Sequence, residues 1–247
     1  MNGWLRRVLS FAPRQVPHPI VPEVSNAIEL VRHNRKLAEN LRILAEVQGQ
    51  AKSIQTGRPV NGDGLPIPWY TYPAIEYLER WDLNGKYIFE FGCGSSTLYW
   101  LRRGAVVVAV ENDPDWYEIL RVEQPGTDIR LRQDRASYVG AIAESNERYD
   151  IIIIDGRWRA GCVRSCQSRL RSGGFVILDN SDWYFRTAQA LSSAGFLEVS
   201  FSGFGPINDY TWTTSFFFPL AGVQKTDLLP SRPLGGLKVD GDSEDGM

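Results

Sequence analysis

Residues 86–97 narrow the choice of fold more than any other part of the sequence. The apolar run Tyr-Ile-Phe leads into Glu90 and Phe91, and a turn with two glycines, Gly92 and Gly94, follows. Small hydroxyl residues then open a segment with helical spacing. A buried strand that passes through a glycine turn into a helix is typical of sheets that bind nucleotides, because backbone without Cβ atoms lets a ligand approach closely.

A second strand ends in a second acid. Residues 105–111 read Ala-Val-Val-Val-Ala-Val-Glu, so Glu111 follows Glu90 by 21 residues. That spacing suits a carboxylate that accepts hydrogen bonds from the ribose hydroxyls of a nucleoside. The two segments predict a cofactor that carries a nucleoside, and they leave open whether it is a methyl donor or a dinucleotide.

Apolar runs and helical patterns alternate along the rest of the chain, as they do in a doubly wound sheet. Strands are predicted at residues 86–91, 105–111, 128–133, 149–155 and 175–179. Helices are predicted at residues 95–103, 114–121, 135–146, 160–171 and 183–194. No helix fits between 196–203 and 211–218, which predicts an antiparallel hairpin. The expected fold is α/β: a doubly wound, Rossmann-like sheet of about seven strands with an antiparallel terminal hairpin.

The chain before the sheet is predicted to be a helical N-terminal extension. A Pro-rich stretch at residues 12–22 precedes a helical pattern over 25–54, in which apolar residues recur every seven positions. Such a seam is compatible with a homodimer, and docking of the helix on its own domain is an open alternative. The boundaries are set at 1–82 for linker, helix and substrate-side lid, 83–221 for the cofactor-binding domain and 222–247 for a tail that we expect to be disordered.

Composition excludes several classes of function. The formal net charge is −2, so the sequence lacks the excess of basic residues that is typical of nucleic-acid-binding proteins. No stretch of about 18 apolar residues exists, so no membrane span is expected, although the basic, amphipathic residues 4–11 could touch a membrane surface. The three cysteines give no disulfide framework, which favours a cytoplasmic location.

Each of the five parallel strands is predicted to deliver an acid to one edge of the sheet, where such folds bind their ligands. The acids are Glu90, Glu111, Asp134, Asp155 and Asp179. Like charges at one edge raise one another's pKa and cost stability. A ligand that offers hydroxyls, an amine or a cation is therefore the better explanation for them.

At residues 85–220 the chain resembles the class I S-adenosylmethionine-dependent methyltransferases. The resemblance rests on the Glu90 glycine turn, on Glu111 and Asp134, and on the terminal hairpin. It implies methyl transfer from S-adenosylmethionine, with an oxygen of a small-molecule or glycan-like substrate as the acceptor. The cofactor-binding residues that it implies are Glu90, Gly92, Gly94, Ser95, Ser96, Glu111, Asn112, Asp134, Arg135 and Asp155.

These residues would divide the cofactor between them. The turn glycines would let backbone lie against the methionine part, and Glu90 would face its ammonium through water or backbone. Glu111 would accept the ribose hydroxyls. Asp134, with Arg135 beside it, would flank the edge of the adenine.

Three features favour the methyl donor over a dinucleotide. Thr97 replaces the third glycine of a dinucleotide turn, and Glu90 just before the turn would repel a pyrophosphate. The last two strands form a hairpin instead of a further βα unit. An NAD-dependent oxidoreductase stays as the alternative, as does a non-catalytic scaffold assembled through the helix at residues 25–54.

A second, partial resemblance is to the metal-dependent O-methyltransferases of the catechol and caffeoyl-CoA type. It rests on Asp155 after the fourth strand and on Asp179-Asn180 after the fifth, which would hold Mg²⁺ or another divalent cation. Trp158 stands where that type has a basic lysine. Asp155, Arg157 and Asp179 are thus the expected catalytic residues. If no metal binds, Asp155 would act as general base or Asp179 would hydrogen-bond the substrate.

Overall fold

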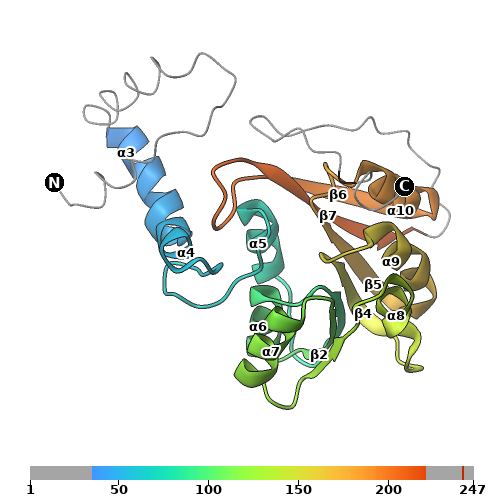
Figure 1. Ribbon diagram of the computed structural model, residues 1–247. Coiled ribbons are helices and arrows are strands. Elements are labelled where there is room, and N and C mark those ends of the chain that lie inside the picture. The colour runs from blue at the N-terminus through green and yellow to red at the C-terminus, as the bar shows by residue number, and fades with distance from the viewer. Residues whose placement is uncertain (1–34, 221–240, 242–247) are drawn as a thin grey trace. The chain divides into compact units, whose positions relative to one another are not determined.

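The computed structural model describes residues 35–220 and residue 241 (Figure 1). Expectations for residues 1–34, such as a membrane contact through residues 4–11, lie outside the described part. So do those for the tail at 222–247, apart from Gly241, whose N–H donates to the carbonyl of Trp183 (3.2 Å). None of the described helices is both long and apolar enough to cross a membrane.

The chain divides into two compact units, residues 1–44 and 45–247. The described end of the first unit holds α3 (Arg35–Arg42) and the start of a π-helical turn, η1 (Ile43–Val47). All other described elements belong to the second unit, which contains the sheet. The domain boundaries derived from the sequence remain predictions.

The helix expected over residues 25–54 is not continuous in its described part, so this expectation was wrong. The helical conformation is interrupted at Gly49, and a new helix, α4 (Gln50–Thr56), begins after it. Gly49 has a left-handed φ of 84°, and a Cβ on it would lie 2.3 Å from the carbonyl carbon of Asn61. The helical spacing of apolar residues runs through this glycine, whereas the break depends on a later loop that packs against it. A homodimer through this segment stays a prediction.

Seven strands form one sheet in the order β3-β2-β1-β4-β5-β7-β6 (Figure 1). They are β1 (Tyr87–Phe91), β2 (Val106–Glu111), β3 (Asp128–Leu131), β4 (Tyr149–Ile154), β5 (Leu170–Asp179), β6 (Phe196–Gly203) and β7 (Trp212–Pro219). The first five are parallel, and β7 lies between β5 and β6, antiparallel to both. The predicted doubly wound sheet and terminal hairpin are confirmed. The place of β7 beside β5 is new.

Helices cover both faces of the sheet (Figure 1). One layer holds α5 (Tyr72–Glu79), α6 (Ser95–Arg102) and α7 (Pro114–Glu123), and the other holds α8 (Arg135–Gly140), α9 (Arg159–Cys166) and α10 (Phe185–Ser193). The 3-10 turns η2 (Ala141–Ala143) and η3 (Gln167–Arg169) replace the ends of the longer helices expected at 135–146 and 160–171. Apolar strands such as β4 are continuous runs because both of their faces are buried.

β5 begins earlier than the sequence suggested. A strand was expected over 175–179 only, yet Leu170 already pairs with Tyr149, while Phe175 pairs with Ile151. The extra residues on β5 form a bulge that contains Gly173 at a φ of 77°. The glycine therefore marks an irregularity within the strand instead of a turn before it.

Candidate functional site

The turn after β1 is built over a buried carboxylate. Glu90 has no exposed surface, and its two oxygens accept hydrogen bonds from Thr97 Oγ1 (2.5 Å) and Trp100 Nε1 (3.2 Å) on α6. Thr97 Oγ1 also accepts the backbone N–H of Gly94 (3.0 Å). Burial raises the pKa of Glu90 to about 7, against the effect of its side-chain hydrogen bonds. Thr97, which stands where a dinucleotide turn has its third glycine, thus connects the turn to Glu90.

The two turn glycines are needed for different reasons. Gly92 has a φ of 87°, and a Cβ on it would lie 2.7 Å from the Cα of Gly156. The turns after β1 and β4 therefore touch backbone to backbone. Gly94 is extended, at a φ of 178°, and the nearest atom to a Cβ there would be Trp116 Nε1 at 3.6 Å. A Cβ on Gly94 would thus make an ordinary contact with Trp116, whereas one on Gly92 would clash with backbone.

Glu111, at the end of β2, is held by backbone amides. Its Oε1 accepts the N–H groups of Asn112 (2.7 Å) and Asp113 (2.9 Å), and its Oε2 accepts that of Cys93 (3.0 Å). Only 6% of Glu111 is exposed. Two amides thus occupy Oε1, and Oε2 also accepts the weakly donating Cys93 thiol (3.5 Å), a contact that a ligand hydroxyl could replace.

Asp134 follows β3 and caps α8. Its Oδ1 accepts the N–H of Ser137 (3.0 Å) and its Oδ2 accepts Ser137 Oγ (2.5 Å), and these bonds lower the pKa of Asp134. Arg135 lines, with Arg164, a shallow hollow of about 560 Å³ between α8 and α9. The cap accounts for the position of Asp134, and a contact of either residue with adenine stays a prediction.

A buried arginine joins the ends of β4 and β5. Arg159, at the start of α9, is 7% exposed and donates to the Asp155 carboxylate (3.2 Å) and to the carbonyls of Asp155 (3.1 Å) and Gly156 (3.0 Å). It also donates to the carbonyl of Asp179. The guanidinium carbon lies 4.3 Å from the ring centre of Tyr184. A fixed positive charge therefore sits beside both acids.

Asp179 is fixed from the other side by β7. It is 3% exposed, and its Oδ1 accepts Trp212 Nε1 (3.1 Å) and Thr214 Oγ1 (2.5 Å). Burial raises the pKa of both Asp155 and Asp179, and the charge of Arg159 opposes that rise. Both acids thus stand in surroundings that make proton uptake easier than in water.

This geometry does not suit the divalent cation that the second resemblance implied at Asp155, Asp179 and Asn180. Arg159 already supplies the positive charge between the two strand ends, and one oxygen of Asp179 is taken by two donors from β7. Asn180 is left-handed at a φ of 53°, and its carbonyl accepts two N–H groups of the following turn. In the part of the chain that is described, no group of three or more His, Cys, Asp or Glu could hold a metal ion.

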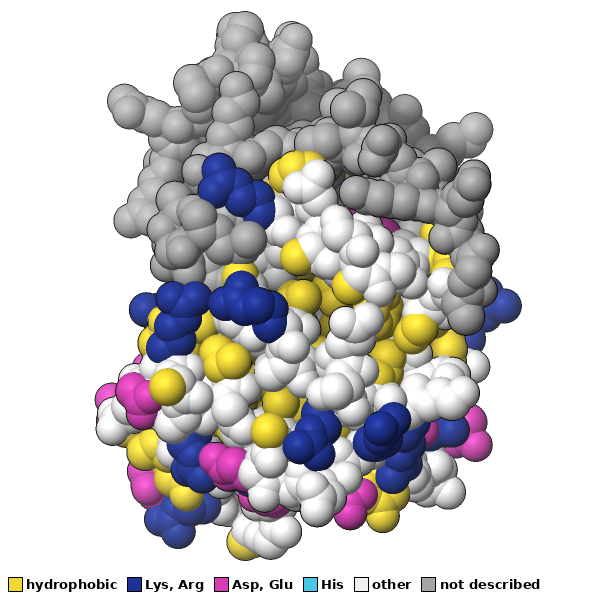
Figure 2. Space-filling model, turned by 90° about the vertical axis from the view of Figure 1, so that its right-hand side faces the viewer, with side chains coloured by type: hydrophobic (Ala, Val, Ile, Leu, Met, Phe, Trp, Pro, Cys, Tyr) yellow, Lys and Arg dark blue, Asp and Glu magenta, His cyan; other side chains and the backbone are white. Residues whose placement is uncertain are grey.

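The arginine that contacts these acids is Arg159, not the expected Arg157. Arg157 is exposed, with its guanidinium carbon 5.9 Å from the ring centre of Trp158. The indole of Trp158 in turn meets the ring of Tyr138 edge-on at 5.3 Å. Figure 2 shows that the basic side chains on the face of α8–α10 are spread out instead of gathered at one place.

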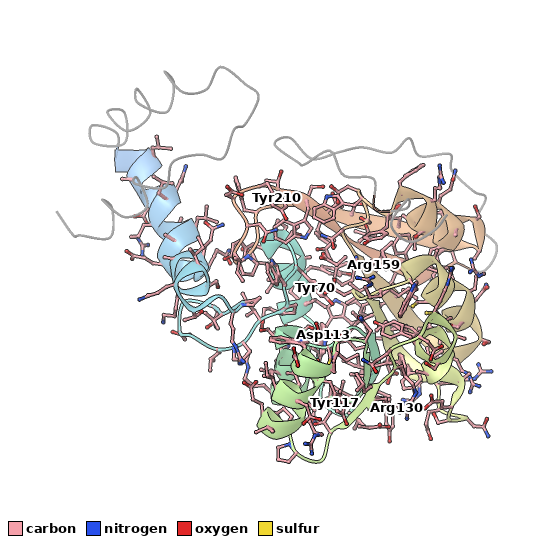
Figure 3. All side chains as sticks on the ribbon, in the orientation of Figure 1. Tyr70, Asp113, Tyr117, Arg130, Arg159 and Tyr210 are labelled. Carbon is pink, nitrogen blue, oxygen red and sulfur yellow. The ribbon has the colours of Figure 1, made fainter. Side chains whose placement is uncertain are left out.

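Next to the ends of β5 and β7, the segment before α5 packs against β7 and against the loop between β6 and β7. The N–H of Thr71 donates to Thr214 Oγ1 (3.1 Å), and Trp69 Nε1 donates to Asn208 Oδ1 (3.0 Å). Between them, Tyr70 is fully buried beside the sheet (Figure 3). Its hydroxyl has no hydrogen-bond partner among the residues that the structure describes.

Comparison with protein-family models and with curated protein sequences gave no match. Among solved structures, a candidate O-methyltransferase from Klebsiella pneumoniae is similar, with a TM-score of 0.52 and 17% identity over 75% of this chain and 97% of that one. The protein has the class I methyltransferase fold. A methyltransferase from Pyrococcus furiosus gives a TM-score of 0.45 and 17% identity over 73% and 98%. At this identity the first likeness bears on the fold, and the reaction must be argued from the site.

On this class I fold most of the predicted residues fall into two groups at the carboxyl edge of the sheet, apart from Asp134 and Arg135 after β3 and the exposed Arg157. Around the ends of β1 and β2 lie Glu90, Gly92, Gly94, Ser95, Ser96, Glu111 and Asn112. Around the ends of β4 and β5 lie Asp155, Asp179 and Asn180. Sequence reasoning missed the residues that surround the second group, which are Tyr70, Arg159, Trp212 and Thr214. The spacing of four between Asp155 and Arg159 was the available signal for one of them.

Proposed function

We propose that the protein transfers a methyl group from S-adenosylmethionine to a hydroxyl oxygen of a neutral small-molecule or glycan-like acceptor. One observation carries this proposal. The partly exposed backbone at Gly94 follows directly after Cys93, whose amide is one of the three that hold the Glu111 carboxylate in place. A cofactor with a ribose and an amino-acid tail requires both features side by side.

The charges of the site support the same cofactor. Four acids, Glu90, Glu111, Asp155 and Asp179, lie at this edge with Arg159, the one buried cation among the described residues. Burial raises the pKa of Glu90, Asp155 and Asp179, and a ligand that carries a sulfonium and an ammonium group would favour the ionised forms of these acids. The pyrophosphate of a dinucleotide, or an anionic acceptor, would oppose their ionisation.

The residues of the site divide the work. Glu111 would hold the ribose, and the backbone at Gly94 would lie along the methionine part. When bound, S-adenosylmethionine supplies an electrophilic methyl group. Asp155, whose side chain is 21% exposed, would take the proton from the acceptor hydroxyl, and burial raises its pKa towards the range in which a general base works well. Arg159 stays protonated and therefore orients Asp155 instead of acting as a base.

Calorimetry with S-adenosylmethionine, S-adenosylhomocysteine and NAD⁺ tests the proposal. Wild type should bind the first two and not the third. Glu111→Ala should bind S-adenosylmethionine about 100-fold more weakly, because the loss of a fixed, charged acceptor costs about 3 kcal/mol. Glu118→Ala, which removes an exposed acid paired with Arg121 on α7, should bind like wild type.

Glu111 also ties two loops together, so the folding of its variants must be checked. Circular dichroism and the melting temperature of Glu111→Gln, which keeps one acceptor oxygen, separate a folding defect from a binding defect. If folded wild type binds no S-adenosylmethionine, the proposal is wrong. Binding of NAD⁺ instead would favour the oxidoreductase alternative.

A further inference from the structure

The Tyr70 hydroxyl is a buried polar group that neither the fold nor the cofactor site uses. The residue is 0% exposed, and its oxygen has no hydrogen-bond partner among the described residues. A buried hydroxyl without a partner costs folding free energy, which is why such groups are rare in native proteins. A ligand that is present only during function would explain why the group stands there.

The position of Tyr70 is fixed by the residues that hold the acids. Its ring centre lies 6.5 Å from that of Trp100, whose indole nitrogen donates to Glu90. The backbone N–H of the next residue donates to Thr214 Oγ1, and that hydroxyl in turn donates to Asp179. Tyr70 is therefore held between the strand ends of β1 and β5.

The surroundings also determine what the phenol can do. Burial raises the pKa of Tyr70 far above its usual value, and the negative charges of Asp155, Glu90 and Asp179 raise it further. The group stays protonated, so it can only serve as a hydrogen-bond donor or as a weak acceptor. Figure 3 shows Tyr70 next to the helix layer of α5, while Arg159 belongs to the layer of α9.

We propose that Tyr70 is a catalytic residue that donates a hydrogen bond to the acceptor oxygen, opposite Asp155. The inference rests on the proposed function and adds the group that orients the nucleophile. An alcohol oxygen carries one proton and two lone pairs. If its proton points to Asp155 and one lone pair is bound by Tyr70, the other lone pair is left to attack the methyl carbon.

The step balances in atoms and charge. The acceptor oxygen forms a bond to the methyl carbon, and its proton passes to the Asp155 carboxylate. The electron pair of the broken carbon–sulfur bond stays on sulfur, which becomes neutral. Tyr70 keeps its proton throughout. Asp155 then releases its proton to water through the exposed part of its side chain.

Tyr72 offers a matched control for the first test. Its hydroxyl is also buried without a partner among the described residues, and it is 4% exposed, but burial alone raises its pKa. Tyr70→Phe and Tyr72→Phe each remove an unpaired hydroxyl, so neither should lower the melting temperature. A lower melting temperature for Tyr70→Phe alone would mean that the hydroxyl has a structural partner, and the proposal would be overturned.

The second test uses glycerol as a neutral polyol in place of the acceptor. In a crystal of the S-adenosylhomocysteine complex soaked in glycerol, a glycerol or water oxygen should lie roughly 3 Å from the Tyr70 oxygen. In concentrated glycerol, S-adenosylhomocysteine should form about 100-fold more slowly with Tyr70→Phe than with wild type or Tyr72→Phe. Equal rates for wild type and Tyr70→Phe, or a Tyr70 oxygen with nothing in contact, would overturn the inference.

Calorimetry separates this inference from the function on which it rests. Tyr70→Phe should bind S-adenosylmethionine as tightly as wild type does, because Tyr70 faces the acceptor. If wild type binds no S-adenosylmethionine, the proposed function has failed. If it binds, and Tyr70→Phe behaves like wild type in glycerol, only the role of Tyr70 has failed.

Discussion

The two halves of the sheet edge hold most of their acids in different ways. In the half that we propose as the cofactor half, at the ends of β1, β2 and β3, Glu111 and Asp134 accept backbone N–H groups from nearby turns, whereas Glu90 is buried and held by side chains of α6. In the acceptor half, at the ends of β4, β5 and β7, Asp155 and Asp179 are held by side chains, those of Arg159, Trp212 and Thr214.

The difference separates binding from chemistry. The hydrogen bonds from the Ser137 hydroxyl and then from the Ser137 amide lower the pKa of Asp134, so they stabilise the ionised form and fix its position. In the acceptor half, burial raises the pKa of Asp155 and Asp179. The first arrangement suits a ligand that is held, and the second suits a group that takes up a proton and releases it.

The largest expected effect is in the acceptor half, at Arg159. Arg159→Ala should lower the free energy of unfolding by about 3–5 kcal/mol, because it leaves a buried carboxylate and the carbonyls of Asp155, Gly156 and Asp179 without this donor. Urea denaturation measures the change. Arg157→Ala, in an exposed neighbour, should change stability by less than about 0.5 kcal/mol.

Two outcomes would contradict this account of Arg159. Equal stability losses in Arg159→Ala and Arg157→Ala would mean that the buried ion pair does not hold the β4 and β5 ends together. Heat of binding on titration of wild type with Mg²⁺ would mean that Arg159 leaves room for a cation beside Asp155 after all.

The next effect concerns Glu90, the buried acid on β1. Its pKa is raised from 4.5 to about 7, so the folded state favours the protonated form. The corresponding stability is complete below pH 4.5 and is lost as the pH rises through 7, a change on the order of 3 kcal/mol. Urea denaturation at pH 5 and pH 8 should show less of this loss in Glu90→Gln than in wild type.

Asp155 and Asp179 contribute pH dependence of the same sign, so the difference between wild type and Glu90→Gln is the informative quantity. Glutamine has one acceptor oxygen for the two donors Thr97 and Trp100, and Glu90→Gln should therefore be less stable at pH 5. If both proteins lose the same stability between pH 5 and pH 8, Glu90 is ionised in both states and belongs with Glu111 and Asp134.

The comparison also explains what could be predicted from the sequence. The fold could be predicted, because parallel strands that are buried on both faces consist of continuous apolar runs, such as residues 149–154. The positions of Glu111 and Asp134 could also be predicted, because the amides of Asn112, Asp113 and Ser137 that hold them lie in the residues that follow directly. The break at Gly49 could not, since it depends on packing against Asn61.

The surroundings of the acids in the acceptor half could not be predicted either, because they too depend on packing between segments that are distant in the sequence. Trp212 and Thr214 meet Asp179 only because β7 inserts beside β5, and no local pattern encodes that insertion. The unpaired hydroxyl of Tyr70 is visible only once burial is known. Sequence spacing thus identifies acids of the proposed cofactor half, and tertiary packing creates the surroundings of the acids in the proposed acceptor half.

Gly92 lies at the joint between the two halves. Gly92→Ala should cost about 2–3 kcal/mol of stability, because a Cβ would press on the Cα of Gly156 in a left-handed backbone. Gly173→Ala shares the positive φ but meets nothing within 4 Å, and it should cost only about 1 kcal/mol. Equal losses in urea denaturation would mean that the turns after β1 and β4 move apart easily.

The smallest effect is expected at Asp134, in the cofactor half. Asp134→Ala removes the cap of α8 and should lower the melting temperature by about 3 °C, whereas Asp134→Asn keeps an acceptor oxygen and should melt like wild type. Calorimetry with S-adenosylmethionine then sharpens the role. If Asp134→Asn binds as wild type does and Asp134→Ala binds more weakly, the oxygen serves through the cap or through a neutral hydrogen bond to adenine. Weaker binding by Asp134→Asn at an unchanged melting temperature would instead show that the cofactor uses the charge itself, which a helix cap does not require.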